Sequence, residues 1–519
     1  MEGVRTRTAG SAGLTGMHSM RTVWWPLLRA DIVHAWSILG VRRGFVGMVL
    51  IGLGSMGPAF LPPDAPILDQ LHLSWLNWGP LRLLLTGVLL VGVLLLVDGW
   101  LRLRPGGSRP RVPVVTWALW SMPILLTPPL FSRDAYSYAA QGLVVSRGMD
   151  PYQTGPIAVP GPFADQVDTS WLYTAAPYGP IALQVQHFVV WLTGGNAYAA
   201  AVGMRLPALL SLAVIAYALP RLARRLGVST QQAVWLGVLN PLVVLHLVGG
   251  AHNDAMMIAL VCLGLLLASR GHLVWASLAI AGAAGFKQTA VLALVAVAGL
   301  VMRSRGEPML QRRYLRLTTL SGVVATTGFA VLTQLTGLGW GWVLNLSVPA
   351  SMRSLLSPPT FVGSIAEGTM YLMGLSKSWQ AVPVPLMQTL GGLTALAVIV
   401  WMALRVAPRS PIAAAAGALT ALCLGGPVIH PWYLLWGGVL FGAMTLSRRL
   451  LRICILVSLF LVAYSAIDAA VANGYWTLAL TVVALLAWRS RSSQGRQPEW
   501  RDKDPARSPL PPVDLLTAR

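Results

Sequence analysis

The feature that most limits how this chain can fold is a series of apolar runs, each near or above the length that crosses the hydrocarbon of a membrane. These runs recur along most of the sequence, and about 18–20 apolar residues are enough for one crossing. Of the 519 residues, 55% are hydrophobic and 11% are charged, whereas soluble domains carry roughly 25% charged residues. The sequence therefore predicts an all-α fold, a polytopic transmembrane helical bundle.

The placement of the basic residues decides what the net charge of +21 implies. They lie in short connectors between apolar runs rather than on one continuous face, which is typical of a membrane protein with its basic loops inside the cell. We therefore expect no nucleic-acid partner. The cysteines fall inside apolar runs and suggest neither a disulfide framework nor a zinc site; they are Cys262, Cys423 and Cys454.

Charge and apolar runs divide the chain into three parts. Residues 1–43 form a basic segment expected in the cytoplasm, 44–489 form the transmembrane domain, and 490–519 form a polar cytoplasmic tail expected to be disordered. The first apolar run has no clear small-residue cleavage site and is interpreted as a retained anchor. The expected spans are 44–62, 80–101, 112–130, 198–220, 232–249, 254–269, 273–285, 289–302, 317–337, 386–406, 411–428, 431–446, 450–468 and 474–489.

The arginine-rich connectors indicate which end of each span faces the cytoplasm. They put two longer polar segments, about 131–180 and 338–385, outside the cell. The run 181–193 is too short for a full span and is expected to be re-entrant or partly crossing. The protein is thus expected in the plasma membrane as a multi-pass protein, with four polar clusters on the extracytoplasmic side: those around residues 134, 252, 287 and 430.

Asp134 opens the first outer segment, directly after an apolar run. One interpretation is a cap for the helix expected to begin at Ala135, with Ser132 or Asp134 accepting backbone N–H bonds. The other is catalysis, because ionisable residues near the membrane are functional more often than elsewhere. Arg133 beside it would hold the carboxylate ionised, as a general base requires. The two interpretations are compatible.

The turn His252-Asn253-Asp254 joins two apolar runs. It is open to two interpretations: a hydrogen-bonded cap for the following span, or the wall of an outward-facing polar pocket whose side chains bind sugar hydroxyls. His, Asn and Asp also ligate metals, but one short cluster is weak support for a metal site.

Lys287 is the only lysine between residue 1 and residue 376. It stands beside Gln288 in a short break between two apolar runs, where it either snorkels to the interface or binds a lipid-linked phosphate.

The segment His430-Pro431-Trp432-Tyr433 begins a later run. Its rings are either ordinary interfacial aromatics or a face on which a sugar stacks. Three other polar residues are accessories of a site or structural: Asn196, Arg205 and Asn240.

Four motifs carry a family resemblance. They are Arg133-Asp134-Ala135-Tyr136-Ser137-Tyr138-Ala139-Ala140-Gln141-Gly142, Asp150-Pro151-Tyr152, Pro177-Tyr178-Gly179-Pro180 and Gly250-Ala251-His252-Asn253-Asp254. Together they resemble the GT-C glycosyltransferases, and more closely the polyprenol-phosphate-mannose-dependent α-1,6-mannosyltransferases. Those enzymes build the mannan backbone of lipomannan and lipoarabinomannan in actinobacterial envelopes. Many GT-C enzymes have two adjacent acids where this chain has Asp134 alone, so the resemblance gives no support to a metal held by paired carboxylates.

The resemblance implies a fold, a reaction and a set of site residues. The fold is a GT-C bundle over 44–489, with outer loops that carry short helices. The reaction is the inverting transfer of mannose from a polyprenyl-phosphate-mannose donor to a mannan or phosphatidylinositol-mannoside-type acceptor. No cofactor is expected from the sequence, which leaves the use of a divalent metal ion open. Asp134 would be the general base. The donor phosphate would be bound by Lys287, Arg133, His252 and His430. The sugar and the acceptor would be bound by Tyr136, Tyr138, Gln141, Tyr178, Asn253, Asp254, Gln288, Trp432 and Tyr433.

Two other functions remain open at this point. One is a GT-C transferase of another sugar or acceptor. The other is a lipid or sugar transporter, such as a flippase, which would also explain many spans and an outward cavity. Transporters usually show repeated halves and broken helices near the midplane. This sequence has no convincing internal repeat, and its polar clusters lie at one face.

Overall fold

The part of the chain that the computed structural model describes is helical. The described residues are 26, 28–57, 68–69, 72–106 and 110–472, and none of them lies in a β-strand. The predicted all-α class is confirmed for this part of the chain. The expected span 474–489, the tail 490–519 and most of the N-terminal segment 1–43 lie outside the described residues.

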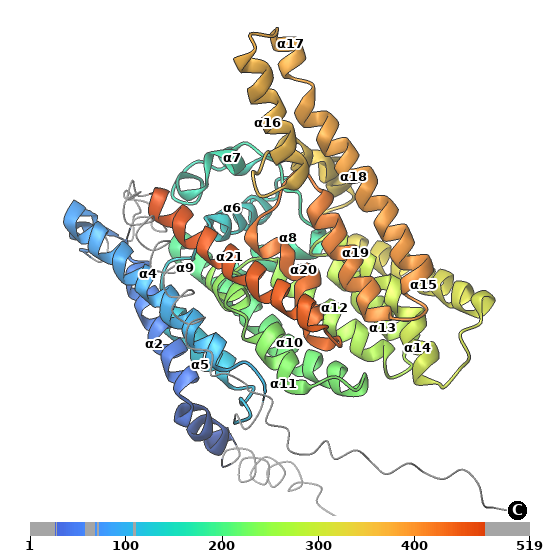
Figure 1. The fold of residues 1–519 in the computed structure, drawn as a ribbon. Coiled ribbons are helices and arrows are strands. Elements are labelled where there is room, and N and C mark those ends of the chain that lie inside the picture. Colours follow the sequence, from blue (N-terminus) through green and yellow to red (C-terminus); the bar gives the residue numbers. More distant parts are fainter. Residues whose placement is uncertain (1–25, 27, 58–67, 70–71, 107–109, 473–519) are drawn as a thin grey trace, which may run out of the picture.

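The longer α-helices alternate with short helical pieces (Figure 1). The longer ones are α2 (Leu39–Gly54), α4 (Gly79–Arg102), α6 (Asp134–Ser146), α8 (Pro180–Leu192), α10 (Arg205–Arg225), α12 (Asp254–Ala268), α13 (Leu273–Ala284), α15 (Gln311–Leu335), α16 (Pro358–Leu372), α18 (Pro383–Trp401), α19 (Pro411–Gly425) and α21 (Arg448–Ala472). The shorter ones are α5 (Thr116–Ser121), α7 (Thr169–Leu172), α9 (Ala197–Gly203), α11 (Thr230–Gln232), α14 (Val297–Ser304), α17 (Lys377–Gln380) and α20 (Leu435–Gly438).

The remaining pieces are 3₁₀ or π turns. The 3₁₀ pieces are η1 (Ser74–Asn77), η2 (Met122–Ile124), η3 (Pro156–Ala158), η4 (Ala164–Gln166), η7 (Gln288–Ala296), η8 (Gly341–Ser351), η10 (Pro431–Leu434) and η11 (Val439–Ala443). The π pieces are η5 (Ala233–Val238), η6 (Val243–Gly249) and η9 (Met402–Val406). Such turns inside helices often accompany functional sites, and η6 leads directly to the predicted His252 turn.

Within the described residues, 5 helical stretches are long and apolar enough to cross a membrane: Gly79–Arg102, Ala197–Arg225, Gln311–Leu335, Lys377–Val406 and Arg448–Val471. Two bent pairs would raise this number to 7, namely Leu28–Ser37 with Leu39–Gly54 and Thr230–Val238 with Val243–Gly249. The long stretches overlap expected spans, and the second bent pair coincides with the expected span 232–249. The chain is therefore a membrane protein with several spanning helices.

Besides the bent pair at 232–249, the expected spans 112–130 and 431–446 are not continuous helices. The segment 112–130 contains only α5 and η2, because prolines remove backbone donors and interrupt the helix at Pro123, Pro128 and Pro129. The segment 431–446 consists of η10, α20 and η11. The expected short run 181–193 forms α8, whose 13 residues extend about 20 Å. The helix is shorter than the roughly 30 Å of bilayer hydrocarbon, as the sequence predicted.

Helices α2 and α4 lie side by side along one edge of the molecule (Figure 1). Their glycines allow the two backbones to touch: a Cβ on Gly47 would lie 2.7 Å from the Gly92 carbonyl oxygen, and a Cβ on Gly99 would lie 2.7 Å from that of Gly40. Close approach at small residues is the usual way in which membrane helices associate, since lipid offers no hydrophobic driving force.

The helices that lead to the predicted site are short. α12, α13 and α19 have 15, 12 and 15 residues, or about 18–22 Å. The predicted polar clusters lie at one end of each of these helices and at the start of α6, which packs against α8 and α9. Helix α16, in the expected loop 338–385, packs against α18, and α16 and α17 project from the body in Figure 1. Both expected outer loops thus carry short helices, as predicted.

Candidate active site

Four polar segments that are far apart in the sequence meet in one cluster. Asp134 begins α6, the His252–Asp254 turn joins η6 to α12, Lys287 lies between α13 and η7, and the segment His430–Tyr433 begins η10. Contacts join neighbouring members: Asp134 to His252, Asp254 to Lys287, and Trp432 to both His252 and His430. The four segments that the sequence singled out therefore lie together in the structure.

The segments that precede Asp134 and His252 are bonded to each other. The N–H of Leu130 donates to the carbonyl of Gly249 at 3.0 Å. Each segment then turns through a non-glycine residue in the left-handed region, Phe131 with φ 58° and Ala251 with φ 54°. Such conformations cost on the order of 1–3 kcal/mol each and persist only where the surrounding structure enforces them.

Arg205 supplies much of that enforcement. Its guanidinium, on a residue 2% exposed, donates to the carbonyls of Thr127 and Pro128 on the first segment. It also donates to those of Val248 and Gly249 on the second, at 3.3 and 2.9 Å. Five N–H donors in a planar fork suit this task. The sequence left Arg205 as an accessory or structural residue, and the structure gives it a specific role in holding two site segments together.

The Asp134 carboxylate is partly enclosed and does not serve as a cap. Its Oδ2 lies 3.4 Å from the Tyr138 hydroxyl and 3.4 Å from His252 Nδ1, and its side chain is 15% exposed. The side chain that accepts a backbone N–H at the start of α6 is Ser132, whose hydroxyl accepts the Asp134 N–H at 3.0 Å. The carboxylate is therefore left available for chemistry.

Histidine, rather than arginine, sets the ionisation of Asp134. Burial alone would raise the pKa of this carboxyl, but the hydrogen bond and the charge of His252, with a smaller contribution from His430, lower it from 3.8 to about 2. Arg133 forms no ion pair with Asp134 among the described residues. The expectation that Arg133 would hold the carboxylate ionised is thus corrected. A side chain adjacent in sequence need not face its neighbour, and His252 approaches from the turn between η6 and α12.

Lys287 is held by one acid and two aromatic rings. Its Nζ lies 2.9 Å from Asp254 Oδ1, 4.0 Å from the centre of the Tyr433 ring and 4.6 Å from that of Trp436. Trp436 Nε1 donates to the same Asp254 oxygen at 2.5 Å. Burial would lower the pKa of Lys287, but the Asp254 carboxylate outweighs burial and raises it, so the ammonium stays charged.

Three rings stack beside Asp134. Trp432 lies between His252, at a centroid distance of 3.7 Å, and His430, at 4.6 Å, and both pairs are nearly parallel. Burial lowers the pKa of His430 to about 4, although the Asp134 carboxylate opposes this. His430 is therefore neutral at physiological pH. It can donate or accept a hydrogen bond, but it does not supply the positive charge expected of a phosphate-binding cation.

The other predicted residues surround this cluster. Tyr138 and Tyr178 form an edge-to-face pair with centroids 5.3 Å apart. Tyr136 is buried within electrostatic reach of Arg205. Several buried polar atoms near the cluster lack a hydrogen-bond partner among the described residues, and a polar ligand or water normally satisfies such atoms. They are His252 Nε2, Asn253 Nδ2, Gln288 Nε2 and both amide atoms of Gln141.

Sequence reasoning missed Trp436. It follows Trp432 by four residues in the chain, so both could be expected on one helical face, but nothing in the sequence showed that this face meets Asp254 and Lys287. His246 was missed as well. It lies behind the stack, 5.5 Å from Trp432 and 6.0 Å from His252 between ring centroids. Its position in an apolar run gave no signal of a site.

Potential metal ligands do not gather in the described ranges. These residues contain no group of three or more His, Cys, Asp or Glu side chains placed to hold a metal ion. The cluster therefore consists of one histidine-bound carboxylate, one ammonium bound by a second carboxylate, and an aromatic wall. This arrangement can accept a proton, stabilise an anion and contact the apolar face of a sugar ring.

Comparison with known proteins gives consistent matches. The family described as "Alpha-(1->6)-mannopyranosyltransferase, N-terminal domain" matches residues 41–303, and "MptB C-terminal domain" matches residues 359–492. The chain is 33% identical to alpha-(1->6)-mannopyranosyltransferase A of Mycobacterium tuberculosis, over 79% of this chain and 80% of that protein. It is 29% identical to alpha-(1->6)-mannopyranosyltransferase A of Corynebacterium glutamicum (84% and 94%) and 30% identical to the B enzyme of that organism (76% and 71%).

Proposed function

The chain belongs to the alpha-(1->6)-mannopyranosyltransferase family and is a glycosyltransferase, and we propose that it moves mannose from polyprenyl-phosphate-mannose to a mannan acceptor with inversion, forming α-1,6 linkages. The acceptor is of the mannan or phosphatidylinositol-mannoside type. The enzyme works in the plasma membrane with its site on the extracytoplasmic side. The observation that carries the proposal is the presence of an ionised carboxylate and a charged ammonium in one partly buried cluster.

In the proposed reaction, Asp134 is the general base. The 6-hydroxyl oxygen of the acceptor attacks the anomeric carbon of β-mannosyl phosphate and forms the new C–O bond. The C–O bond to the phosphate breaks with its electron pair, and the hydroxyl proton passes to Asp134. A positioned base of this kind contributes typically about 10²–10⁴-fold. A single displacement of a β-linked donor yields an α-linked product.

In the same scheme, Lys287 stabilises the departing phosphate. The polyprenyl phosphate gains negative charge as the bond breaks, and it needs a cation more than a proton. Lys287 is charged and its side chain is 14% exposed, so it is enclosed yet accessible. Asp254 and Trp436 hold it in place through the bonds to Asp254 Oδ1. A fixed charge in an enclosed site costs no reorganisation during the reaction and stabilises the leaving group more than it would in water.

The depth of the cluster supports a lipid-linked donor. The helices that end beside it extend only about 18–22 Å, which is less than the roughly 30 Å of hydrocarbon that α15 and α18 can cross. A cluster at the end of short helices, flanked by longer ones, lies within reach of a phosphate on a membrane-embedded chain. A water-soluble nucleotide sugar would not need a binding site at this depth in the membrane.

The stacked wall supports a sugar substrate. The apolar face of a pyranose packs on flat aromatic surfaces, and Trp432 offers such a surface between two imidazoles. The unpartnered amides of Asn253 and Gln288 are suited to hydroxyl groups. These residues would orient the mannosyl ring and the acceptor, with Tyr138 and Tyr178 closing the side nearest α6.

A membrane assay tests the proposal. Membranes are incubated with labelled polyprenyl-phosphate mannose and a short α-1,6-mannoside, with and without chelator, and the linkage of the product is determined. Wild type should extend the acceptor, whereas Asp134→Asn should lower kcat by roughly 10²–10⁴-fold with donor binding kept. Asp165→Asn is the matched control, because Asp165 is an exposed acid of the same outer segment. Near-normal turnover by Asp134→Asn would refute the base assignment.

The same membranes separate the alternatives. When polyprenyl phosphates that carry other sugars compete with the mannose donor, mannose should still be transferred fastest. Faster transfer of another sugar would show that the chain is a transferase of that sugar instead. A transporter would instead move labelled lipid between leaflets of proteoliposomes without forming a glycosidic bond. Product formation that Asp134→Asn abolishes distinguishes a transferase from that class.

A further inference from the structure

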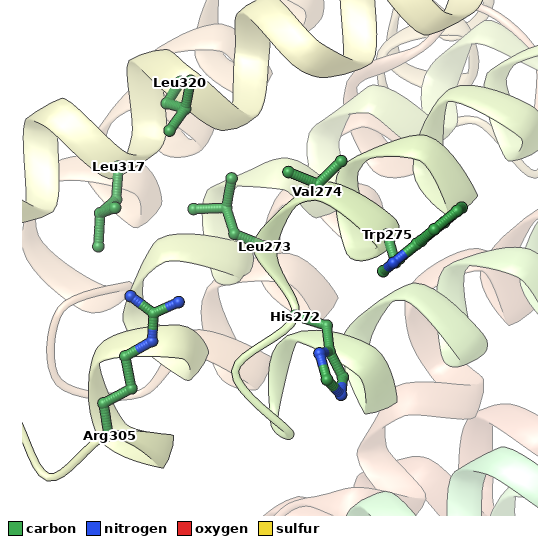
Figure 2. A pocket seen from close by; sticks show the side chains of 7 residues that line it. All are labelled: His272, Leu273, Val274, Trp275, Arg305, Leu317 and Leu320. Atoms are coloured by element: carbon green, nitrogen blue, oxygen red, sulfur yellow. The ribbon is translucent and has the colours of Figure 1, made fainter.

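A cleft lies where α13 begins, at the end of that helix away from the active-site cluster. It has a volume of about 400 Å³ and is lined by His272, Leu273, Val274, Trp275, Arg305, Leu317 and Leu320 (Figure 2). Helix α13 begins at this cleft and ends beside Lys287, so its 12 residues separate the cleft from the active-site cluster by about 18 Å. The cleft does not belong to that cluster.

The cleft lies on the side of α13 and α15 that faces the hydrocarbon. Helices α13 and α15 are joined by the Ser277–Ser321 hydrogen bond of 2.7 Å, and the cleft lies one turn further toward their N-termini. There Val274, Trp275 and Leu320 are 49%, 66% and 46% exposed. Because α15 is long and apolar enough to span the membrane, these side chains meet lipid rather than water. An exposed tryptophan at a helix end is typical of the bilayer interface.

One end of the cleft is positively charged. The connector 303–316 contains five arginines and one acid, Glu307. Glu307 is already engaged by Arg313, with Nε to Oε2 at 2.6 Å, and its contact with Arg305 is longer, at 4.0 Å. Arg305 otherwise donates to the Gly271 carbonyl at 3.1 Å, and its side chain is 44% exposed. The guanidinium is therefore partly engaged but accessible at the edge of the apolar cleft (Figure 2).

We propose that this cleft binds one anionic phospholipid, with the phosphate on Arg305 and an acyl chain between the beginnings of α13 and α15. The apolar part of the cleft, which is open to hydrocarbon, suits the acyl chain. The guanidinium of Arg305 suits the phosphate. Basic pockets between membrane helices recognise acidic headgroups in the same way. The volume lies within the roughly 300–1,000 Å³ range of ligand sites. This lipid is neither donor nor acceptor, because the cleft lies away from the catalytic cluster.

Native mass spectrometry of the full chain tests this inference. The protein is placed in nanodiscs with equal amounts of phosphatidylglycerol and phosphatidylcholine and is then released into detergent. Wild type should retain phosphatidylglycerol in preference. Arg305→Gln should lower the retained ratio about fivefold, the factor expected for one basic residue near an anionic headgroup. Arg448→Gln is the matched control, since Arg448 is an exposed arginine that does not line the cleft.

A cross-linking arm locates the lipid. Phosphatidylglycerol with a photoactivatable acyl chain should label peptides that contain residues 272–275 or 317–320, and unlabelled phosphatidylglycerol should compete better than phosphatidylcholine. The inference is overturned if Arg305→Gln retains the wild-type ratio, if Arg448→Gln lowers it equally, or if label appears only elsewhere. All these readouts measure lipid binding, so they do not depend on the proposed transferase activity.

Discussion

Asp134 and Lys287 are each held in a charged state by one partner from a distant part of the chain. His252 contacts the carboxylate, and Asp254 contacts the ammonium. Because His252 and Asp254 belong to one turn, a single short motif controls both charges. The turn that sequence reasoning saw as a sugar-binding wall therefore has an electrostatic role as well.

Removing the imidazole tests the first of these contacts. His252→Asn should raise the pKa of Asp134, because burial raises it and the His252 interactions that lower it to about 2 are lost. The base would then be protonated at higher pH, so the acid limb of the kcat/KM profile should move to higher pH. The profile is measured from pH 3 upward for both proteins; the wild-type limb, near pH 2, lies below this range, so an acid limb should enter it only in the variant. An acid limb that stays in place would show that Asp134 does not control it.

Removing the ammonium tests the second contact. Lys287→Met should lower kcat/KM for the donor by roughly 10²–10³-fold, the usual loss for a charged donor in such a site. Asp254 would be left buried without its cation, so Lys287→Met/Asp254→Asn is included to keep the fold free of an unpaired charge. Lys377→Met is the control, since Lys377 is exposed on α17. Unchanged donor kinetics in both variants would remove Lys287 from the site.

At the scale of elements, the site depends on helices that are short, interrupted and tied together. Prolines end α5–η2 before the chain reaches Asp134, and η6 is a π piece that ends before His252. Helix α6 approaches α8 closely because Gly142 has no side chain: a Cβ there would lie 2.6 Å from the Gln186 carbonyl oxygen. Arg205 then joins the segments that precede Asp134 and His252 by donating hydrogen bonds to their backbone carbonyls.

Arg205→Met tests these hydrogen bonds. The substitution leaves carbonyls on both segments without donors, and each buried unsatisfied group costs about 1–3 kcal/mol. We expect a loss of several kcal/mol in the free energy of unfolding, measured by thermal or denaturant unfolding in detergent. Arg205→Lys should recover only part of it, because an ammonium cannot reach as many carbonyls as the guanidinium fork. A Met variant as stable as wild type would contradict the role of Arg205.

At the scale of the whole molecule, the helices have two unlike ends. One carries the cluster of Asp134, Lys287 and the stacked rings, and the other carries the arginine-rich connector 303–316 and the lipid cleft. The basic end is expected in the cytoplasm, and our proposal therefore puts the cluster of Asp134 and Lys287 on the extracytoplasmic side.

Two variants, each with one cysteine added to the native chain, test this orientation. Thr169→Cys lies on the exposed first turn of α7 in the outer segment, and Thr445→Cys lies in the exposed connector before α21. A membrane-impermeant thiol reagent should label Thr169→Cys in intact cells and Thr445→Cys only after permeabilisation. The native cysteines, two of which are buried, serve as background in the unsubstituted chain. The reverse pattern would invert the topology.

The sequence by itself determined the class of the fold and singled out the candidate site residues. Apolar length and arginine placement are local properties, so they predicted an all-α membrane bundle. Asp134, the His252 turn and Lys287 stood out because ionisable groups near hydrocarbon are costly and therefore rare. The short α8 was also predicted, since helix length follows directly from the number of residues.

Only the tertiary structure decided which side chains meet. The local sequence suggested Arg133 as the partner of Asp134, whereas helix packing places His252 against it. The same packing places Trp436 beside Lys287. It also allows Arg205 to bond to two separate segments. The tertiary structure also showed that 112–130 and 431–446 are broken, and it opened the cleft at Arg305. These contacts arise between residues tens to hundreds of positions apart, and hydropathy and charge patterns carry no information on how the helices rotate against one another.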